Sequence, residues 1–189
     1  MGILNLIIGP MFSGKTTELI RIYNKYNITT PNSKENSQIM VINHISDKRY
    51  SNDSVCSHNL EQINSISLKN LNDYYSLFKN GYEDCNNIIL IDEAQFFEDL
   101  YDFCKNIVDT TNKTIYVFGL SGDYQREKFG QILDLIPIAD NIKHLKALCY
   151  NCQIFKEASF TKRVVNDKKQ ISVGGNDKYI AVCRDCYLN

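Results

Sequence analysis

Residues 3–16, with the sequence ILNLIIGPMFSGKT, join an apolar run to a glycine-rich loop and determine the fold class. The apolar run predicts a buried strand over residues 3–8, and a helix is predicted over residues 13–26. The loop between them matches G-x-x-x-x-G-K-[ST], in the strand–loop–helix context that this pattern needs. Its backbone N–H groups and the helix N-terminus form a site for phosphate. We therefore expect ATP to be bound by Gly9, Pro10, Met11, Phe12, Ser13, Gly14, Lys15 and Thr16.

Two side chains of this loop have expected roles of their own. Lys15 is expected to reach the β- and γ-phosphates of ATP, and the Thr16 hydroxyl is expected to contact Mg²⁺. The glycines let the chain come close to the phosphates. The competing interpretation is a glycine turn that matches by chance, and the strand and helix on either side make it a minor one.

The sequence alternates short β-branched runs with helical patterns as far as about residue 148. Strands are predicted over residues 38–43, 87–91 and 114–119, and helices over residues 68–79 and 96–108. Apolar strands separated by helices are typical of a mostly parallel sheet with helices on both faces. The fold class is therefore α/β, with a P-loop, recombinase-like domain over residues 1–148 and a small zinc-binding lobe over residues 149–189.

A second motif, IILIDE at residues 88–93, is an apolar strand that ends in two carboxylates. Beside a phosphate loop, Asp92 is the expected magnesium ligand, directly or through water. Glu93 follows where the chain leaves the sheet, and open α/β sheets bind ligands beyond the carboxyl ends of their strands. A carboxylate there can accept a proton from an attacking hydroxyl or water. Taken alone, the two acids are equally well interpreted as a solvated strand end.

The same region, DEAQ at residues 92–95, is similar to the D-E-x-x box of helicases. Such motors need a second recombinase-like lobe or a partner subunit, and 189 residues leave no room for that lobe. The alternative that remains is a P-loop ATPase that acts on nucleic acid through a zinc ribbon. The chain has 21 basic and 22 acidic side chains, whereas binding to a phosphate backbone usually needs a basic excess. We therefore expect no nucleic acid partner.

The composition is that of an ordinary globular protein, with 43% hydrophobic and 23% charged residues. The apolar start ends at Gly9 and Pro10 and has no basic flank, so it is too short for a signal peptide or a membrane span. We expect no membrane association. Seven cysteines form an odd set, and without a secretion signal they indicate a reduced, cytoplasmic location where paired cysteines bind metal.

Four of the cysteines form two C-x-x-C knuckles, Cys149 with Cys152 and Cys183 with Cys186. Four thiolates suit tetrahedral Zn²⁺, and with no open position the site is expected to be structural. Free buried cysteines or redox pairs are the weaker interpretation. The long segment between the knuckles, which contains a double glycine and Tyr179, is either a clamp over a planar ligand or an ordinary hairpin, and the spacing does not decide between them.

Several further motifs occur along the chain in a fixed order. They are DKRY at residues 47–50, DEAQFF at 92–97, GDYQR at 122–126, FG at 129–130, TKR at 161–163 and GGNDKYIAVCRDCY at 174–187. Together with the phosphate loop, which continues as TEL to residue 19, these motifs are similar to the cytosolic, zinc-containing (type II) thymidine kinase family. The resemblance covers nearly the whole chain, and the motifs are specific jointly rather than one by one.

The resemblance implies an ATP-dependent thymidine kinase, which phosphorylates the 5′-hydroxyl of thymidine to give dTMP and ADP in nucleotide salvage. Deoxyuridine is a second expected acceptor, and Glu93 is implied as the general base. The implied ATP site extends to Asp47, Lys48, Arg49, Asp92 and Gln95. The implied nucleoside site, closed by a lasso loop that reads the base largely through backbone groups, comprises Phe96, Tyr124, Gln170, Ile171, Ser172, Val173, Gly174 and Tyr179.

The resemblance also implies a homotetramer, feedback inhibition by dTTP, and two metals, Mg²⁺ with ATP and structural Zn²⁺. Three residues depart from the family pattern. Ser121 stands where Asp is usual, Tyr124 where Phe is common, and Lys128 where Pro is common. All three are expected near the nucleoside, so they bear on substrate selectivity rather than on the reaction.

Overall fold

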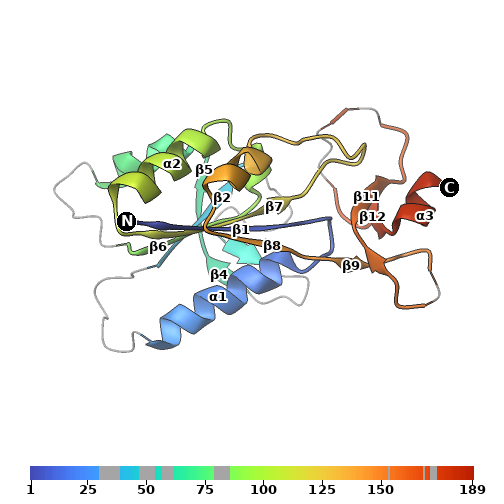
Figure 1. Cartoon of the computed structure of the whole chain (residues 1–189), viewed down its shortest axis with the longest axis horizontal. Coiled ribbons are helices and arrows are strands. Elements are labelled where there is room, and N and C mark those ends of the chain that lie inside the picture. Colours follow the sequence, from blue (N-terminus) through green and yellow to red (C-terminus); the bar gives the residue numbers. More distant parts are fainter. Residues whose placement is uncertain are drawn as a thin grey trace.

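The computed structural model describes most of the chain, namely residues 1–29, 39–46, 54–56, 62–78, 86–152, 154–167, 169–170 and 174–189. Within these residues the chain forms a large sheet with helices, and a smaller lobe that holds the C-terminus (Figure 1). In the part that the structure describes, no helix is both long enough and apolar enough to cross a membrane.

The central sheet has six strands in the order β5-β2-β6-β7-β1-β8, and every neighbouring pair is parallel. The strands are β1 (Ile3–Gly9), β2 (Ile39–His44), β5 (Ile66–Leu68), β6 (Ile88–Ile91), β7 (Thr114–Leu120) and β8 (Asn141–His144). This confirms the predicted α/β class with a mostly parallel sheet. The predicted strands are β1, β2, β6 and β7, the four inner strands; the two edge strands were not predicted.

Helices cover both faces of the sheet, as expected (Figure 1). Along β1, the alternating residues Leu4, Leu6 and Ile8 pack with α2 (Leu100–Thr110) and with two 3-10 helices, η1 (Leu71–Phe78) and η3 (Ile132–Ile138). Ile7, between them, faces the other side, where it packs with α1 (Lys15–Thr29) and the short antiparallel strands β3 (Ser54–Cys56) and β4 (Gln62–Asn64). A strand buried on both faces reads as a continuous apolar run, which is why β1 was visible in the sequence.

The helix predicted over residues 96–108 begins later than expected. A 3-10 turn, η2 (Ala94–Phe96), comes first, and α2 begins at Leu100. Asp99 precedes α2, and its carboxylate accepts hydrogen bonds from the backbone N–H groups of Leu71 and Asn72 instead of capping its own helix. The start of α2 is therefore set by a contact with η1, which the local sequence does not reveal.

The C-terminal part of the chain folds into two antiparallel strand pairs and a short helix. β9 (Ala147–Leu148) pairs with β10 (Glu157–Ala158), β11 (Phe160–Arg163) pairs with β12 (Tyr179–Val182), and α3 (Arg184–Leu188) follows. Their small core is built mainly from alanine, valine and cysteine side chains, and Phe12 of the loop after β1 packs against it. The small lobe and the large sheet thus share a contact at that loop.

Candidate functional site

An open cavity lies where β1, β6 and β7 end. The carboxyl ends of parallel strands are the usual ligand sites of open α/β sheets. Its walls come from five parts of the chain: the loop after β1, Ser46 after β2, the turn after β6, the segment after β7, and the small lobe. They include Lys15, Thr16, Glu93, Gln95, Phe96, Asp123, Tyr124, Phe129, Thr161, Arg163, Gln170, Gly174 and Tyr179.

The loop between β1 and α1 has two residues in the left-handed region of backbone conformation. Phe12 and Gly14 have positive φ angles of 63° and 80°, and for Gly14 this costs little because it has no Cβ. The Lys15 side chain is buried, and its Nζ donates hydrogen bonds to the carbonyl oxygens of Gly9 and Pro10 at 3.2 and 2.7 Å. The ammonium group is therefore held at the loop, beside the first turn of α1.

This loop is also bound to the small lobe, which the sequence motifs did not predict. The backbone N–H of Met11 donates to Oγ1 of Thr161 on β11, at 3.0 Å. Thr161 is buried, and Phe12 packs against the core of the lobe. Thr161 belongs to the TKR motif, so the sequence singled it out without giving it a role.

Asp92, which follows β6, and Thr16, in the first turn of α1, approach each other. Thr16 Oγ1 lies 3.5 Å from Asp92 Oδ2, and the backbone N–H of Glu93 donates to Asp92 Oδ1 at 3.0 Å. Asp92 is buried at the end of β6. A carboxylate and a hydroxyl oxygen side by side are the kind of hard ligands that Mg²⁺ takes from a protein. The donor set therefore fits the magnesium site expected at these two residues.

Glu93 has backbone angles in the left-handed region, φ 47° and ψ 41°, directly after β6. Its carboxylate lines the cavity, and Oε2 accepts a hydrogen bond from Nε2 of Gln95 at 2.5 Å. Oε1 of Gln95 in turn accepts from the backbone N–H of Leu120 at 3.1 Å. Gln95 therefore connects the acid to β7 and fixes its direction.

A glycine on the segment after β7 makes this arrangement possible. Gly130 has a φ of 61°, and a Cβ at this position would lie 2.1 Å from the carbonyl oxygen of Gln95. Any side chain there would push the turn that carries Gln95 and Glu93. The close approach of Gly130 to the backbone of Gln95 therefore explains the glycine of the FG motif.

Phe96 sits among aromatic rings at the edge of the cavity. Its ring meets that of Phe129 edge to face, with centroids 5.4 Å apart, and stacks on His44 at 5.6 Å. Burial lowers the pKa of His44, and its Nδ1 accepts a hydrogen bond from the backbone N–H of Ser46. An imidazole that accepts through Nδ1 is neutral, so Phe96 rests on an uncharged ring.

The wall opposite the loop after β1 is built around Arg163. Its guanidinium carbon lies 3.7 Å from the ring centroid of Tyr124 and 5.1 Å from that of Tyr179. Nη2 also donates to the Tyr179 hydroxyl, at 2.6 Å. The hydroxyl of Tyr187, on α3, donates to the carbonyl oxygen of Tyr124 at 2.8 Å. Tyr124 is therefore held by the small lobe on both its ring and its backbone.

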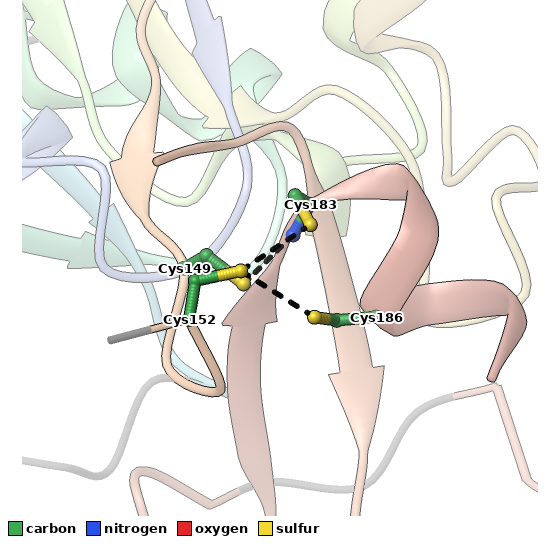
Figure 2. Close-up of side chains that lie close together, drawn as sticks. All are labelled: Cys149, Cys152, Cys183 and Cys186. Atoms are coloured by element: carbon green, nitrogen blue, oxygen red, sulfur yellow. Dashed lines mark hydrogen bonds between the residues drawn. The ribbon is translucent and has the colours of Figure 1, made fainter. Parts of the chain in front are cut away.

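The four cysteines of the two knuckles come together in the small lobe (Figure 2). Their Sγ atoms all lie within 4.8 Å of one another, and Cys152 Sγ is 3.8 Å from Cys183 Sγ and 3.6 Å from Cys186 Sγ. Zinc–sulfur bonds of about 2.3 Å in a tetrahedron place the ligand sulfurs about 3.8 Å apart. The cluster can therefore hold a metal ion such as zinc, as predicted.

The environment of Cys149 favours the thiolate that zinc binding requires. Burial raises the pKa of this thiol, but backbone N–H groups, first that of Cys183 at 3.2 Å, lower it by more, to about 6. The position next to the start of α3 is thus suited to a metal-bound sulfur.

Several predicted site residues fall outside the described part of the chain. They are Asp47, Lys48 and Arg49 of the DKRY motif, and Ile171, Ser172 and Val173 between the knuckles. Gln170 and Gly174, on either side of the latter three, do line the cavity.

Comparison with known proteins gives a consistent result. A family model described as "Thymidine kinase" matches residues 2–187. The thymidine kinase of sheeppox virus is 39% identical over 187 residues, which cover 99% of this chain and 97% of the viral protein. The cytosolic thymidine kinase of Homo sapiens is 37% identical over 189 residues, covering 99% of this chain and 74% of the human protein. A thymidine kinase of Oryza sativa subsp. japonica is 39% identical over 188 residues, covering all of this chain and 67% of the plant protein.

Proposed function

The chain belongs to the thymidine kinase family, and we propose that it transfers the γ-phosphoryl group of ATP to the 5′-hydroxyl of thymidine, giving dTMP and ADP. One observation carries this proposal beyond family membership. Glu93 lines a single cavity together with residues 11–16 of the loop and with Tyr124 of the aromatic wall. An acceptor hydroxyl between them can meet a base on one side and a triphosphate on the other.

The proposed triphosphate site is the loop of residues 9–16. Lys15 already has its ammonium group at the loop, and the backbone N–H groups at the start of α1 add donors for phosphate oxygens. Thr16 and Asp92 would hold Mg²⁺, which spreads the negative charge of the β- and γ-phosphates when it is bound. Asp47, Lys48, Arg49 and Gln95 are proposed to complete the site on the ATP side.

Glu93 is proposed as the general base. With the direction of the Glu93 carboxylate set by the hydrogen bond from Gln95, this carboxylate would accept the proton of the 5′-hydroxyl of a bound nucleoside as the phosphoryl group transfers. Because Gln95 is itself held by β7, the base is oriented before substrate binds. Such positioning supplies most of the catalysis in phosphoryl transfer.

The nucleoside is proposed to lie against Phe96 and Tyr124, under a lasso loop that includes Gln170, Ile171, Ser172, Val173, Gly174 and Tyr179. The aromatic rings offer apolar faces for a planar base. Tyr124, Gln170, Gly174 and Tyr179 line the same cavity as Glu93, which supports this placement. Deoxyuridine, which lacks the methyl group of thymidine, is proposed as a weaker acceptor.

A structural Zn²⁺ is proposed at Cys149, Cys152, Cys183 and Cys186, in a lobe over residues 149–189. We further propose a homotetramer, feedback inhibition by dTTP and a cytoplasmic location, on the strength of the family resemblance. None of these is needed for the transfer reaction itself.

The decisive experiment offers ATP and Mg²⁺ with each of the four deoxynucleosides and with deoxyuridine, and measures nucleoside monophosphate by chromatography. Formation of dTMP at the highest rate is the expected result. Hydrolysis of ATP that is stimulated by DNA, with no nucleoside monophosphate formed, would overturn the proposal in favour of a nucleic-acid-dependent ATPase.

A further inference from the structure

Asp123 is a buried carboxylate in the cavity wall for which the proposed reaction has no use. Only 5% of its surface is exposed. Its Oδ1 accepts hydrogen bonds from the backbone N–H groups of Gln125 and Glu127, at 2.8 and 2.9 Å, and so closes the turn after β7. Its Oδ2 accepts a hydrogen bond from the side-chain amide of Gln170 at 2.9 Å. One oxygen thus organises a local turn, and the other reaches a residue 47 positions away.

Gln170 is held at both its side chain and its backbone. Nε2 donates to Asp123 and also to the carbonyl oxygen of Lys128, at 3.2 Å. Because both neighbours are acceptors, the amide nitrogen and not its oxygen must face them. The backbone carbonyl of Gln170 accepts from Nη2 of Arg163 at 3.0 Å. Both N–H groups of the Gln170 side-chain amide are therefore used in hydrogen bonds within the protein, and they are not available to a nucleobase.

These contacts complete a ring around one end of the cavity. Arg163 stacks on Tyr124 at 3.7 Å, and Tyr124 follows Asp123 in the chain. The ring therefore runs from Asp123 through Gln170 and Arg163 to Tyr124 and back. It joins the segment after β7 to the small lobe, and all four residues line the cavity.

We propose that Asp123 is a positioning residue for the nucleoside, which acts by holding Gln170 in the cavity wall. The identity of the ligand rests on the proposed function. Because the Asp123–Gln170 pair fixes this wall before the nucleoside binds, less conformational entropy is lost on binding. The pair therefore increases the affinity for the nucleoside. None of the hydrogen bonds described for Asp123 and Gln170 reaches the loop of residues 9–16, so we expect ATP affinity not to depend on the pair.

Gln170→Glu is the sharpest test, because it turns a donor into an acceptor that faces a buried carboxylate and a carbonyl. We expect KM for thymidine to rise about 10- to 30-fold, while KM for ATP stays within about twofold. Gln170→Met removes the hydrogen bonds without adding charge, and its KM for thymidine is expected to rise only about three- to tenfold.

Asp123→Asn introduced into the Gln170→Glu protein reverses the donor and acceptor. The asparagine oxygen keeps the turn at Gln125 and Glu127, and its amide donates to the new carboxylate. We expect this double variant to recover most of the lost affinity for thymidine. If Asp123 only supported its turn, the double variant would bind no better than Gln170→Glu alone, and that result would overturn the proposal.

Gln125→Glu is the matched control. The Gln125 side chain is exposed on the turn after β7, and only its backbone N–H contacts Asp123, so the change adds the same charge as Gln170→Glu near the turn without altering the side chains of the pair. No change in either KM is expected. An increase in KM for thymidine equal to that of Gln170→Glu would mean that charge alone matters, and would overturn the proposal.

Hydrogen exchange of the ligand-free protein separates this inference from the proposed function. In a peptide covering residues 164–178, amide exchange is expected to be faster in Gln170→Glu and close to wild type in the double variant. Absence of dTMP from the wild-type protein would refute the proposed function alone, since the exchange rates report the pair without any substrate. Equal exchange rates in wild type and Gln170→Glu would refute the pair.

Discussion

The two ends of the cavity are built in different ways. At the end proposed for the triphosphate, the groups of the phosphate loop come from consecutive residues, and the hydrogen bonds from Lys15 Nζ to Gly9 and Pro10 span only six and five positions. At the end proposed for the nucleoside, Asp123 meets Gln170 across 47 positions and Tyr187 meets Tyr124 across 63. The first end is made by a motif, and the second by the docking of the small lobe.

This difference predicts how substitutions elsewhere in the chain affect ligand binding at each end. A local loop forms wherever its strand and helix form, so it should tolerate damage elsewhere. An end that is assembled from two parts of the chain loses its geometry when either part loosens. The hydrogen bond from Met11 to Thr161 and the packing of Phe12 against the small lobe cross this division, and they set how far the two ends depend on each other.

The largest effect is expected at Glu93, which lies between the two ends. Glu93→Gln keeps a partner for Gln95 but cannot accept a proton, so kcat is expected to fall at least about 100-fold. KM for ATP should stay nearly unchanged. Steady-state kinetics with both substrates tests this, and a near-normal kcat would remove Glu93 from the role of base.

Loss of the metal should damage the nucleoside end more than the triphosphate end. In Cys152→Ser the cluster loses one sulfur ligand, and we expect the small lobe to lose zinc and stability. Thymidine affinity is then expected to fall at least about tenfold, and ATP affinity about threefold or less, by calorimetric titration. Full zinc content in this variant, by metal analysis, would contradict a four-cysteine site.

Thr161→Val tests the hydrogen bond that joins the two ends. The change keeps the shape of the side chain but leaves the N–H of Met11 without its acceptor, at a cost of about 1–3 kcal/mol. We expect KM for both ATP and thymidine to rise about three- to fivefold. Thr110→Val, which removes an exposed hydroxyl on α2, is the control and should change neither. An effect on thymidine alone would mean that the ends are independent.

The smallest effect is expected outside the cavity, at Glu18 on α1. Hydrogen bonds and ion pairs with Arg21, and then Lys143, lower the pKa of Glu18 from 4.5 to about 2. Because the folded pKa is the lower one, the ionised carboxylate stabilises the fold above about pH 4.5, and this contribution is lost as the pH falls toward 2. Glu18→Gln should therefore cost about 1 kcal/mol at pH 7, since its partners are exposed.

Thermal unfolding of wild type and Glu18→Gln at pH 7 and pH 3 measures this difference. We expect it to shrink by about half or more at pH 3, with both KM values at pH 7 unchanged. A difference that is equal at the two pH values would show that Glu18 acts by packing and not by charge.

The inner part of the sheet was predictable, and its edges were not. β1, β2, β6 and β7 are apolar because both of their faces are covered, so they stand out in the sequence. All four residues of β8 are exposed, and β5 is only three residues long. A short or exposed edge strand has no apolar pattern to recognise, and its pairing partner alone makes it a strand.

The site shows the same division. The loop of residues 9–16, the acids at the end of β6 and the two C-x-x-C knuckles are recognisable by residue type and local spacing, although the two knuckles meet only when the chain folds. The roles of Asp123 and Arg163 could not be predicted in that way.

Asp123 and Arg163 have ordinary side chains whose partners lie on other elements, at Gln170 and Tyr124. Sequence by itself therefore determined the chemistry that this protein can perform, since its motifs place reactive atoms locally. Only the tertiary structure decided how the far wall of the cavity is held, because hydrogen bonds and stacking between distant residues exist only once the small lobe has packed against the sheet.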